Sequence, residues 1–218
     1  MSNLFLMGLA ACPACGSSEK KEELAASNEY AYTRVNCQIT LKDLADREKM
    51  IALGKEIVDA TQSDEGMVKY DMLESITNPG KFIIFETWKD RAVLAKHMEE
   101  PHFIKIIPMI QEIAEITIEV FDQPVDPVDK GNGFRLNISF VIDPKDKEII
   151  KSHALPLVEG SLKEELCTGY DYYYSLANEQ EGLLFEDWPS QAALDFHMAT
   201  PHFLNHYPTE IMSRYKSF

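Results

Sequence analysis

The stretch FETWKDRAVLAKHMEEPHF, residues 85–103, returns as FEDWPSQAALDFHMATPHF at residues 185–203. With an offset of 100 and no gap, residues 70–108 and 170–208 are identical at 15 of 39 positions, which indicates a tandem duplication. Upstream, NCQITLKD (36–43) aligns with NISFVIDP (137–144) when one residue is dropped. The sequence therefore predicts a first domain at 30–121, a proline- and glycine-containing linker at 122–133 and a second domain at 134–218.

Each copy has the pattern strand, helix, strand, strand, helix, strand. Apolar residues alternate in the predicted strands and recur near helical spacing in the first predicted helix. Pro101 ends the second helix, and a short helix follows it. In the first copy the expected strands are 30–39, 67–75, 81–88 and 116–121, and the expected main helices are 44–61 and 90–100. This order predicts an α+β fold of two tandem ferredoxin-like βαββαβ units, each an antiparallel sheet with its helices on one face.

Strand alternation divides the side chains of residues 81–88 between two faces of the sheet. Ile83 and Phe85 share one face, and we expect them to pack against the helices. Glu86 and Trp88 share the other face, which we expect to carry Asn36 as well. Because two such mixed faces would leave apolar surface in water, we expect them to close on each other as an intramolecular barrel.

Composition limits the class of partner. The chain has 45% apolar residues, 26% charged residues and a net charge of -15. This is the composition of a globular protein, and its negative charge would repel nucleic acid and anionic lipid surfaces. No run approaches the roughly 18 consecutive apolar residues of a membrane-spanning helix.

The first 29 residues differ from the rest. The apolar run LFLMGLAAC (4–12) and the polar tether after it resemble a bacterial lipoprotein leader, although no Lys or Arg precedes the run. Cys12 is then the lipidation site, with Cys15 as the alternative, and the protein is expected in the cell envelope. If the leader is not functional, the expected location is the cytoplasm. A redox or metal role for this cysteine pair is disfavoured, because zinc would need two more ligands nearby.

The repeated Tyr-Asp, the Phe-Glu-x-Trp motif, and the His followed by Pro-His-Phe resemble the antibiotic biosynthesis monooxygenase (ABM) domain, including small quinol-monooxygenase-like proteins. The resemblance covers about residues 32–121 and 134–218. Members are dimeric α+β barrels, so the resemblance implies that the two copies form such an α+β barrel of the dimeric type, a pseudo-dimer, within one chain. Further assembly into homo-oligomers is left open. It also implies that a small aromatic or quinol-type substrate is oxygenated by O₂ without cofactor or metal.

Such a substrate reacts with O₂ once it is deprotonated, so the site needs an aromatic environment, a base and a hydrogen-bond donor. We expect His97 and His197 to be the catalytic bases. The expected substrate-binding residues are Asn36, Tyr70, Glu86, Trp88, Asn137, Tyr170, Glu186 and Trp188. For His102 and His202, which follow a proline, we expect structural hydrogen bonds. No metal site is expected, because His97 and His102 straddle a proline break and lack i, i+4 spacing.

Two other functions remain open. The copies could form a non-catalytic module that binds a small hydrophobic molecule or a partner. Some ABM relatives degrade haem, but they have tryptophan where His97 and His197 stand, and a haem-ligating histidine where this chain has Ile107 and Tyr207. The haem function is therefore the less favoured of the two.

Overall fold

The structure, a computed structural model, describes residues 32–122 and 133–207. The leader with Cys12 and Cys15, residues 123–132 of the linker, and residues 208–218 lie outside the described residues. The predictions that concern them stay predictions.

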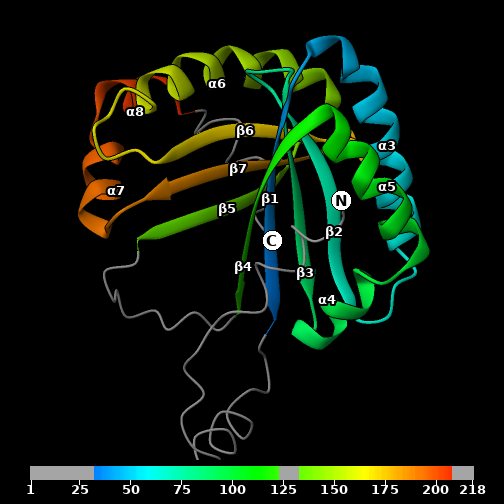
Figure 1. The fold of residues 1–218 in the computed structure, drawn as a ribbon. Coiled ribbons are helices and arrows are strands. Elements are labelled where there is room, and N and C mark those ends of the chain that lie inside the picture. The colour runs from blue at the N-terminus through cyan, green and yellow to red at the C-terminus, as the bar shows by residue number, and fades with distance from the viewer. Residues whose placement is uncertain (1–31, 123–132, 208–218) are drawn as a thin grey trace, which may run out of the picture. The chain divides into compact units, whose positions relative to one another are not determined.

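The two copies fold into the same order of elements (Figure 1). The first copy consists of β1 (Thr33–Leu41), α3 (Arg47–Thr61), β2 (Met67–Ser75), β3 (Lys81–Trp88), α4 (Arg91–His97), α5 (Pro101–Ile113) and β4 (Ala114–Asp122). The second copy consists of β5 (Phe134–Val141), α6 (Lys147–Ser161), β6 (Gly169–Ser175), β7 (Glu181–Trp188), α7 (Gln191–Met198) and α8 (Pro201–His206). Short 3₁₀ helices, Leu44–Asp46 and Pro144–Asp146, precede α3 and α6.

All described strands belong to one antiparallel sheet with the order β4-β1-β3-β2-β6-β7-β5. The strands of the first copy have the ferredoxin-like order β4-β1-β3-β2. The second-copy strands β6, β7 and β5, which correspond to β2, β3 and β1, follow in the reverse order. In Figure 1 the helices α3 and α5 lie along the outside of the first copy's strands, and α6, α7 and α8 lie along the second copy's strands. The fold is thus the predicted α+β arrangement of two tandem units.

The copies join edge to edge at β2 and β6. Leu73 pairs with Ser175, Glu74 with Tyr174, and Ser75 with Tyr173, so the joint has approximate twofold symmetry about the Glu74–Tyr174 pair. Backbone bonds extend it on both sides, from Ile76 N to Tyr172 O (2.7 Å) and from Leu176 N to Met72 O (2.9 Å).

Two buried carboxylates reinforce this joint reciprocally. Asp71 accepts a hydrogen bond from the hydroxyl of Ser175 (3.1 Å), and Asp171 accepts one from the hydroxyl of Thr77 (2.9 Å). Each carboxylate therefore binds a hydroxyl of the other copy. Burial raises the pKa of Asp71 to about 6 and also raises the pKa of Asp171.

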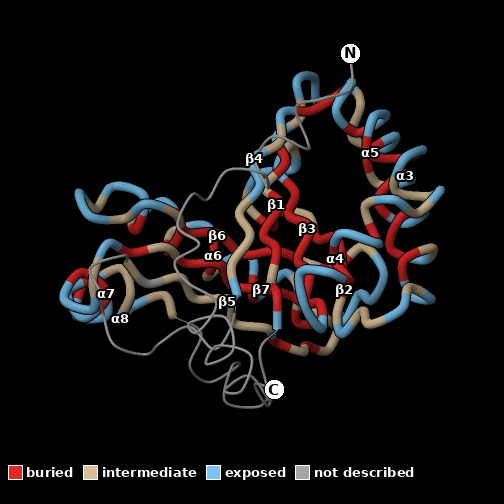
Figure 2. The backbone as a smooth tube through the Cα atoms, turned by 60° about the horizontal axis from the view of Figure 1, so that its bottom comes forward, coloured by how far each residue is buried: buried red, intermediate tan, exposed pale blue. Residues whose placement is uncertain are grey.

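A second contact between the copies is an apolar cluster made by the sheet faces that turn away from the helices. The first copy contributes Leu73, Ile83 and Phe85, and the second contributes Tyr173, Leu183 and Phe185. The expectation that Ile83 and Phe85 pack against the helices is therefore wrong. Successive residues of β3 are buried (Figure 2), and because their side chains alternate between the two faces, apolarity does not distinguish the face beneath the helices from the face toward the other copy.

The outer strands of the two copies also approach each other through side chains. The amides of Asn36 and Asn137 lie together, with the Asn36 Nδ2 atom 3.3 Å from the Asn137 Oδ1 atom. The Arg135 guanidinium pairs with Glu119 on β4 and lies 2.9 Å from the Asp187 carboxylate. The sheet face that meets the other copy thus carries amides and ion pairs beside the apolar cluster.

At one core position the two copies use an aromatic side chain from different strands. The buried Phe82 of β3 corresponds to Gly182 in β7, and the Phe140 ring occupies the space beside this glycine. A Cβ atom at position 182 would lie 2.3 Å from the Phe140 ring. The aromatic side chain that β3 supplies in the first copy is therefore supplied in the second copy by β5, where Phe140 pairs with Gly182.

In residues 32–122 and 133–207, no helix has both the length and the apolar character to cross a membrane.

The cluster between the copies should carry a large share of the stability. We expect Phe185→Ala to lower the free energy of unfolding by roughly 3–5 kcal/mol, because it leaves a cavity among side chains of both copies. Urea unfolding of the full chain measures this. Phe196→Ala is the matched control, since Phe196 is 65% exposed and its loss should change stability by less than about 0.5 kcal/mol. Equal effects of the two substitutions would contradict the role of the cluster.

Candidate active site

The helices α4 and α5 position the two motif histidines of the first copy. The Asp90 carboxylate accepts a hydrogen bond from Val93 N (2.8 Å) and caps α4, which ends at His97. The chain then turns, and α5 begins with Pro101, whose missing N–H costs nothing at the first helical position. His97 and His102 thus come from different helices on either side of one turn.

The turn after α3 supplies a carboxylate. Asp64 N donates to Thr61 O (3.0 Å) and Met67 N donates to Asp64 O (3.2 Å), so backbone bonds on both sides fix the residue. The second copy has the same turn after α6, where Glu164 N donates to Ser161 O (3.0 Å) and Cys167 N donates to Glu164 O (3.1 Å).

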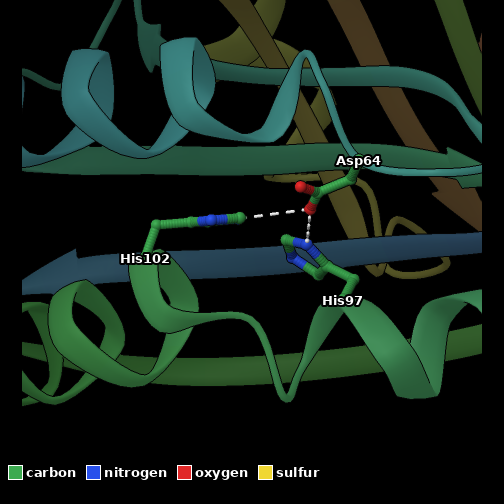
Figure 3. Close-up of side chains that lie close together, drawn as sticks. All are labelled: Asp64, His97 and His102. Carbon is green, nitrogen blue, oxygen red and sulfur yellow. Dashed lines mark hydrogen bonds and ion pairs between the residues drawn. The ribbon is translucent and has the colours of Figure 1, made fainter.

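Each carboxylate lies between the two histidines of its copy (Figure 3). Asp64 Oδ2 is 2.6 Å from His97 Nδ1 and 3.2 Å from His102 Nε2. In the second copy, Glu164 Oε1 is 2.6 Å from His197 Nδ1 and 2.8 Å from His202 Nε2. The two copies therefore contain the same triad of one carboxylate and two imidazoles.

Aromatic rings enclose the first imidazole of each triad. The ring centroid of His97 lies 4.5 Å from Trp88, 5.4 Å from Tyr70 and 5.0 Å from Phe103. The Trp88 indole donates its Nε1–H to the buried Glu86 carboxylate (2.6 Å), which fixes the ring over the imidazole. The second copy repeats this arrangement with His197, Trp188, Tyr170, Phe203 and Glu186.

Burial determines the protonation of this site. Desolvation lowers the pKa of His97 and of His197, and the neighbouring carboxylates only partly oppose this effect. Both imidazoles are therefore neutral at pH 7. Burial also raises the pKa of Glu86 to about 7, against the hydrogen bond from Trp88, and raises the pKa of Tyr70 well above its usual value.

The neutral histidine has a defined tautomer. A carboxylate at 2.6 Å accepts a hydrogen bond, so His97 Nδ1 carries the proton and Nε2 keeps its lone pair. Among the described residues, the Nε2 atoms of His97 and His197 are buried and have no hydrogen-bond partner. The Tyr70 and Tyr170 hydroxyls are buried as well, close to the side chains of Thr61 and Tyr172 respectively. Each copy thus pairs a proton acceptor with a hydroxyl donor in an aromatic environment.

The structure brings most of the sequence-predicted site residues together, but not all of them. In the first copy His97, Tyr70, Glu86 and Trp88 lie beneath the helices, as do their second-copy equivalents His197, Tyr170, Glu186 and Trp188. Asn36 and Asn137 are separate from them. Asn36 pairs with Phe85 in the sheet register, whereas Glu86 pairs with Val35, so Asn36 lies on the opposite face of the sheet from Glu86 and Trp88. The expectation that Asn36 and Trp88 share a face is wrong.

Sequence reasoning missed the two carboxylates. Asp64 and Glu164 obey the same offset of 100, but the exchange of Asp for Glu hides them from a count of identical residues. An acidic residue six positions before each repeated Tyr-Asp was the available signal. Structural hydrogen bonds are expected for His102 and His202. His202 bonds to Glu164, and His102 bonds to Thr61 and lies 3.2 Å from the Asp64 carboxylate.

Comparison with known proteins identifies the family of both copies. The sequence model of the family described as antibiotic biosynthesis monooxygenase matches residues 43–108 and 134–208, well over half of the chain. The chain therefore belongs to this family, and both of its copies are ABM domains.

Two relatives and one solved structure each match a segment about as long as one copy. A Synechocystis protein, sll1783, is 30% identical over 76 residues, which are 33% of this chain and 52% of that protein, so the chain spans about half the length of this relative. A Bacillus subtilis protein named "Putative monooxygenase YcnE" is 27% identical over 74 residues, 34% of this chain and 78% of that protein. A crystal structure of a Bacteroides thetaiotaomicron protein of unknown function, described as "Possible Oxidoreductase", covers 42% of this chain and 97% of its own, with 36% identity and a TM-score of 0.41.

The raised pKa of Glu86 leads to a prediction of how the stability of the protein depends on pH. Because the folded-state value of about 7 exceeds the usual 4.5, the folded state holds this proton where the unfolded state has lost it, so stability falls as the pH rises through this window. Glu86→Gln still accepts from Trp88 but does not titrate. We expect its stability relative to the unmodified protein to rise by roughly 2–4 kcal/mol between pH 4.5 and 7.5.

Chemical denaturation at several pH values measures this difference. Glu99→Gln removes an exposed carboxylate of the nearby turn and is the control, for which we expect a difference independent of pH. A constant difference for Glu86→Gln as well would show that Glu86 is ionised throughout this range.

Proposed function

We propose that the protein is a cofactor-independent monooxygenase of small aromatic, quinol-type substrates, in which His97 and His197 act as bases. The observation that carries this proposal is the buried Nε2 atom of each histidine, which has no partner in the described part of the chain, on a ring whose Nδ1 is bound to a carboxylate. Membership of the ABM family supports a monooxygenase reaction on a small molecule. The substrate class and the independence from a cofactor belong to the proposal alone.

The reaction requires one proton transfer before oxygen reacts. His97 Nε2 takes the phenolic proton, and the electron-rich anion then reduces O₂ and forms a carbon–oxygen bond. One oxygen atom remains in the product and the other leaves as water, with two electrons and two protons supplied by the substrate. The Asp64 carboxylate stabilises the imidazolium that forms, as in other carboxylate–histidine pairs.

Tyr70 is the proposed donor to the substrate oxygen. Its hydroxyl is buried, and its raised pKa keeps the proton in place, so it can donate a hydrogen bond to the phenolate without being deprotonated itself. The Trp88 indole and the Phe103 ring supply aromatic surface on the other sides of His97. The same roles fall to Tyr170, Trp188 and Phe203 in the second copy.

Access to the base requires movement of its neighbours. His97 Nε2 is buried in the structure without substrate. Phe103, on α5, is half-buried and meets the imidazole edge to face, and its displacement is the proposed way in which the site opens. Substrate binding should therefore be coupled to a shift of α5.

Removing both bases should abolish turnover. His97→Asn keeps an N–H donor near the position of Nδ1, where it can bond to Asp64, and removes Nε2. Because each copy has its own site, we expect either single variant to retain the activity of the other copy. For His97→Asn/His197→Asn we expect a loss of about 10²- to 10⁴-fold in kcat.

The assay measures O₂ consumption with a panel of quinols and phenols, and mass spectrometry detects ¹⁸O from ¹⁸O₂ in the product. Lys96→Asn changes an exposed residue of the same helix and should leave turnover unchanged. Full activity of the double variant would overturn the role of the histidines. Saturable binding of these compounds without O₂ consumption would instead support the non-catalytic binding module.

A further inference from the structure

The carboxylate–histidine triads have a property that base catalysis does not use. In each copy one imidazole nitrogen of each histidine and one carboxylate oxygen converge, and all three atoms lie within 4.8 Å of one another. Base catalysis needs only the first histidine and the carboxylate. The second histidine, His102 or His202, adds a third donor atom that points to the same place.

The distances are close to those of a metal site. Zinc bound at about 2.0–2.1 Å to nitrogen and oxygen keeps neighbouring ligand atoms about 3.0–3.4 Å apart. The His102 Nε2 to Asp64 Oδ2 distance of 3.2 Å already fits, and the His97 Nδ1 to Asp64 Oδ2 distance of 2.6 Å is a hydrogen bond that must lengthen by about half an ångström to admit an ion. Small side-chain rotations can provide this.

The burial of the histidines also suits a metal ion that has protein ligands on one side and water on the other. The side chain of His97 is 1% exposed, whereas that of His102 is 17% exposed; in the second copy the values are 0% for His197 and 22% for His202. An ion could enter past the second histidine and keep water in its remaining positions. The buried Thr61 and Thr200 hydroxyls, 3.4 Å and 3.2 Å from the Nε2 atoms of His102 and His202, add polar groups beside these histidines.

The duplication provides an independent observation. Residues 70–108 and 170–208 differ at most positions, yet both copies have the three donors. The carboxylate changed from Asp64 to Glu164, and its oxygen still lies 2.6 Å from the histidine Nδ1 atom. Two side chains of different length thus place an oxygen at the same point between the imidazoles.

The expectation that the proline break rules out a metal site does not hold, because the turn brings the two histidines of each copy to one carboxylate. We propose that each triad is a binding site for a divalent transition-metal ion of the zinc class, with two sites in the chain. The ligands are Asp64, His97 and His102 in the first copy and Glu164, His197 and His202 in the second. Imidazole and carboxylate donors bind Zn²⁺, Co²⁺ and Fe²⁺, whereas two imidazoles make a poor site for Mg²⁺ or Ca²⁺. Three protein ligands leave at least one position to water.

Metal binding has a consequence that rests on the proposed function. An ion on His97 Nδ1 forces the proton of the neutral ring onto Nε2, where it blocks the atom proposed to act as the base. The metal-bound and base-active states of one triad therefore exclude each other. Added Zn²⁺ should inhibit turnover, and a chelator should restore it.

The test uses the full, tag-free chain, stripped of metal and titrated with Zn²⁺ in a calorimeter. We expect two ions per chain, and one ion per chain for Asp64→Asn or Glu164→Gln alone. For Asp64→Asn/Glu164→Gln we expect affinity at these sites at least tenfold lower, with unchanged circular dichroism. Glu65→Gln and Glu165→Gln alter exposed neighbours in the same turns and are the matched controls, which should still bind two ions.

X-ray absorption of the Co²⁺-loaded chain identifies the ligands. Nitrogen and oxygen scatterers with an imidazole signature support the triads. Sulfur scatterers, unchanged stoichiometry in the double variant, or the absence of binding at millimolar Zn²⁺ would overturn the proposal. Because these readouts do not involve turnover, an inactive protein that binds two ions would refute the proposed function alone, and an active protein that binds none would refute the metal sites alone.

Discussion

The hydrogen bond between a buried carboxylate and a buried histidine is the interaction on which the site depends. Asp64 and His97 come from the loop after α3 and the end of α4, and their 2.6 Å contact ties these elements together beneath the helices. The bond sets the tautomer of His97, and the tautomer determines that Nε2 is the atom with the free lone pair. The aromatic neighbours matter because they keep this nitrogen dry and lower the pKa of the ring.

The duplication gives the chain two such sites and one common interior. The copies join at the symmetric β2–β6 edge and at a cluster that includes Phe85 and Phe185, while each triad lies on the other side of its sheet, beneath its own helices. The residues at the contact between the copies therefore pack against the opposite face of the sheet and are not part of the sites. Each copy can in this way diverge in its site, as the exchange of Asp64 for Glu164 shows, without loss of the common core.

The sequence predicted the order of elements and the pairing of the two units, because the repeat and the strand alternation are strong local signals. It did not predict which face of β3 meets the helices. Phe82 through Trp88 are all buried, so alternation shows which side chains share a face but not where that face points. Most of the candidate site could also be read from the repeat, but Asp64 and Glu164 could not. They lie in loops, differ in type, and meet the histidines only through tertiary structure.

The central claim is that His97 is neutral, with its proton on Nδ1 and a lone pair on Nε2. ¹⁵N NMR of the imidazole nitrogens in the full chain tests this most directly, at pH 7 with a chelator present and with His97→Asn to assign the signals. We expect the chemical shift of a protonated nitrogen at Nδ1 and of an unprotonated nitrogen at Nε2. Protonation of both nitrogens, or a proton on Nε2 alone, would contradict it.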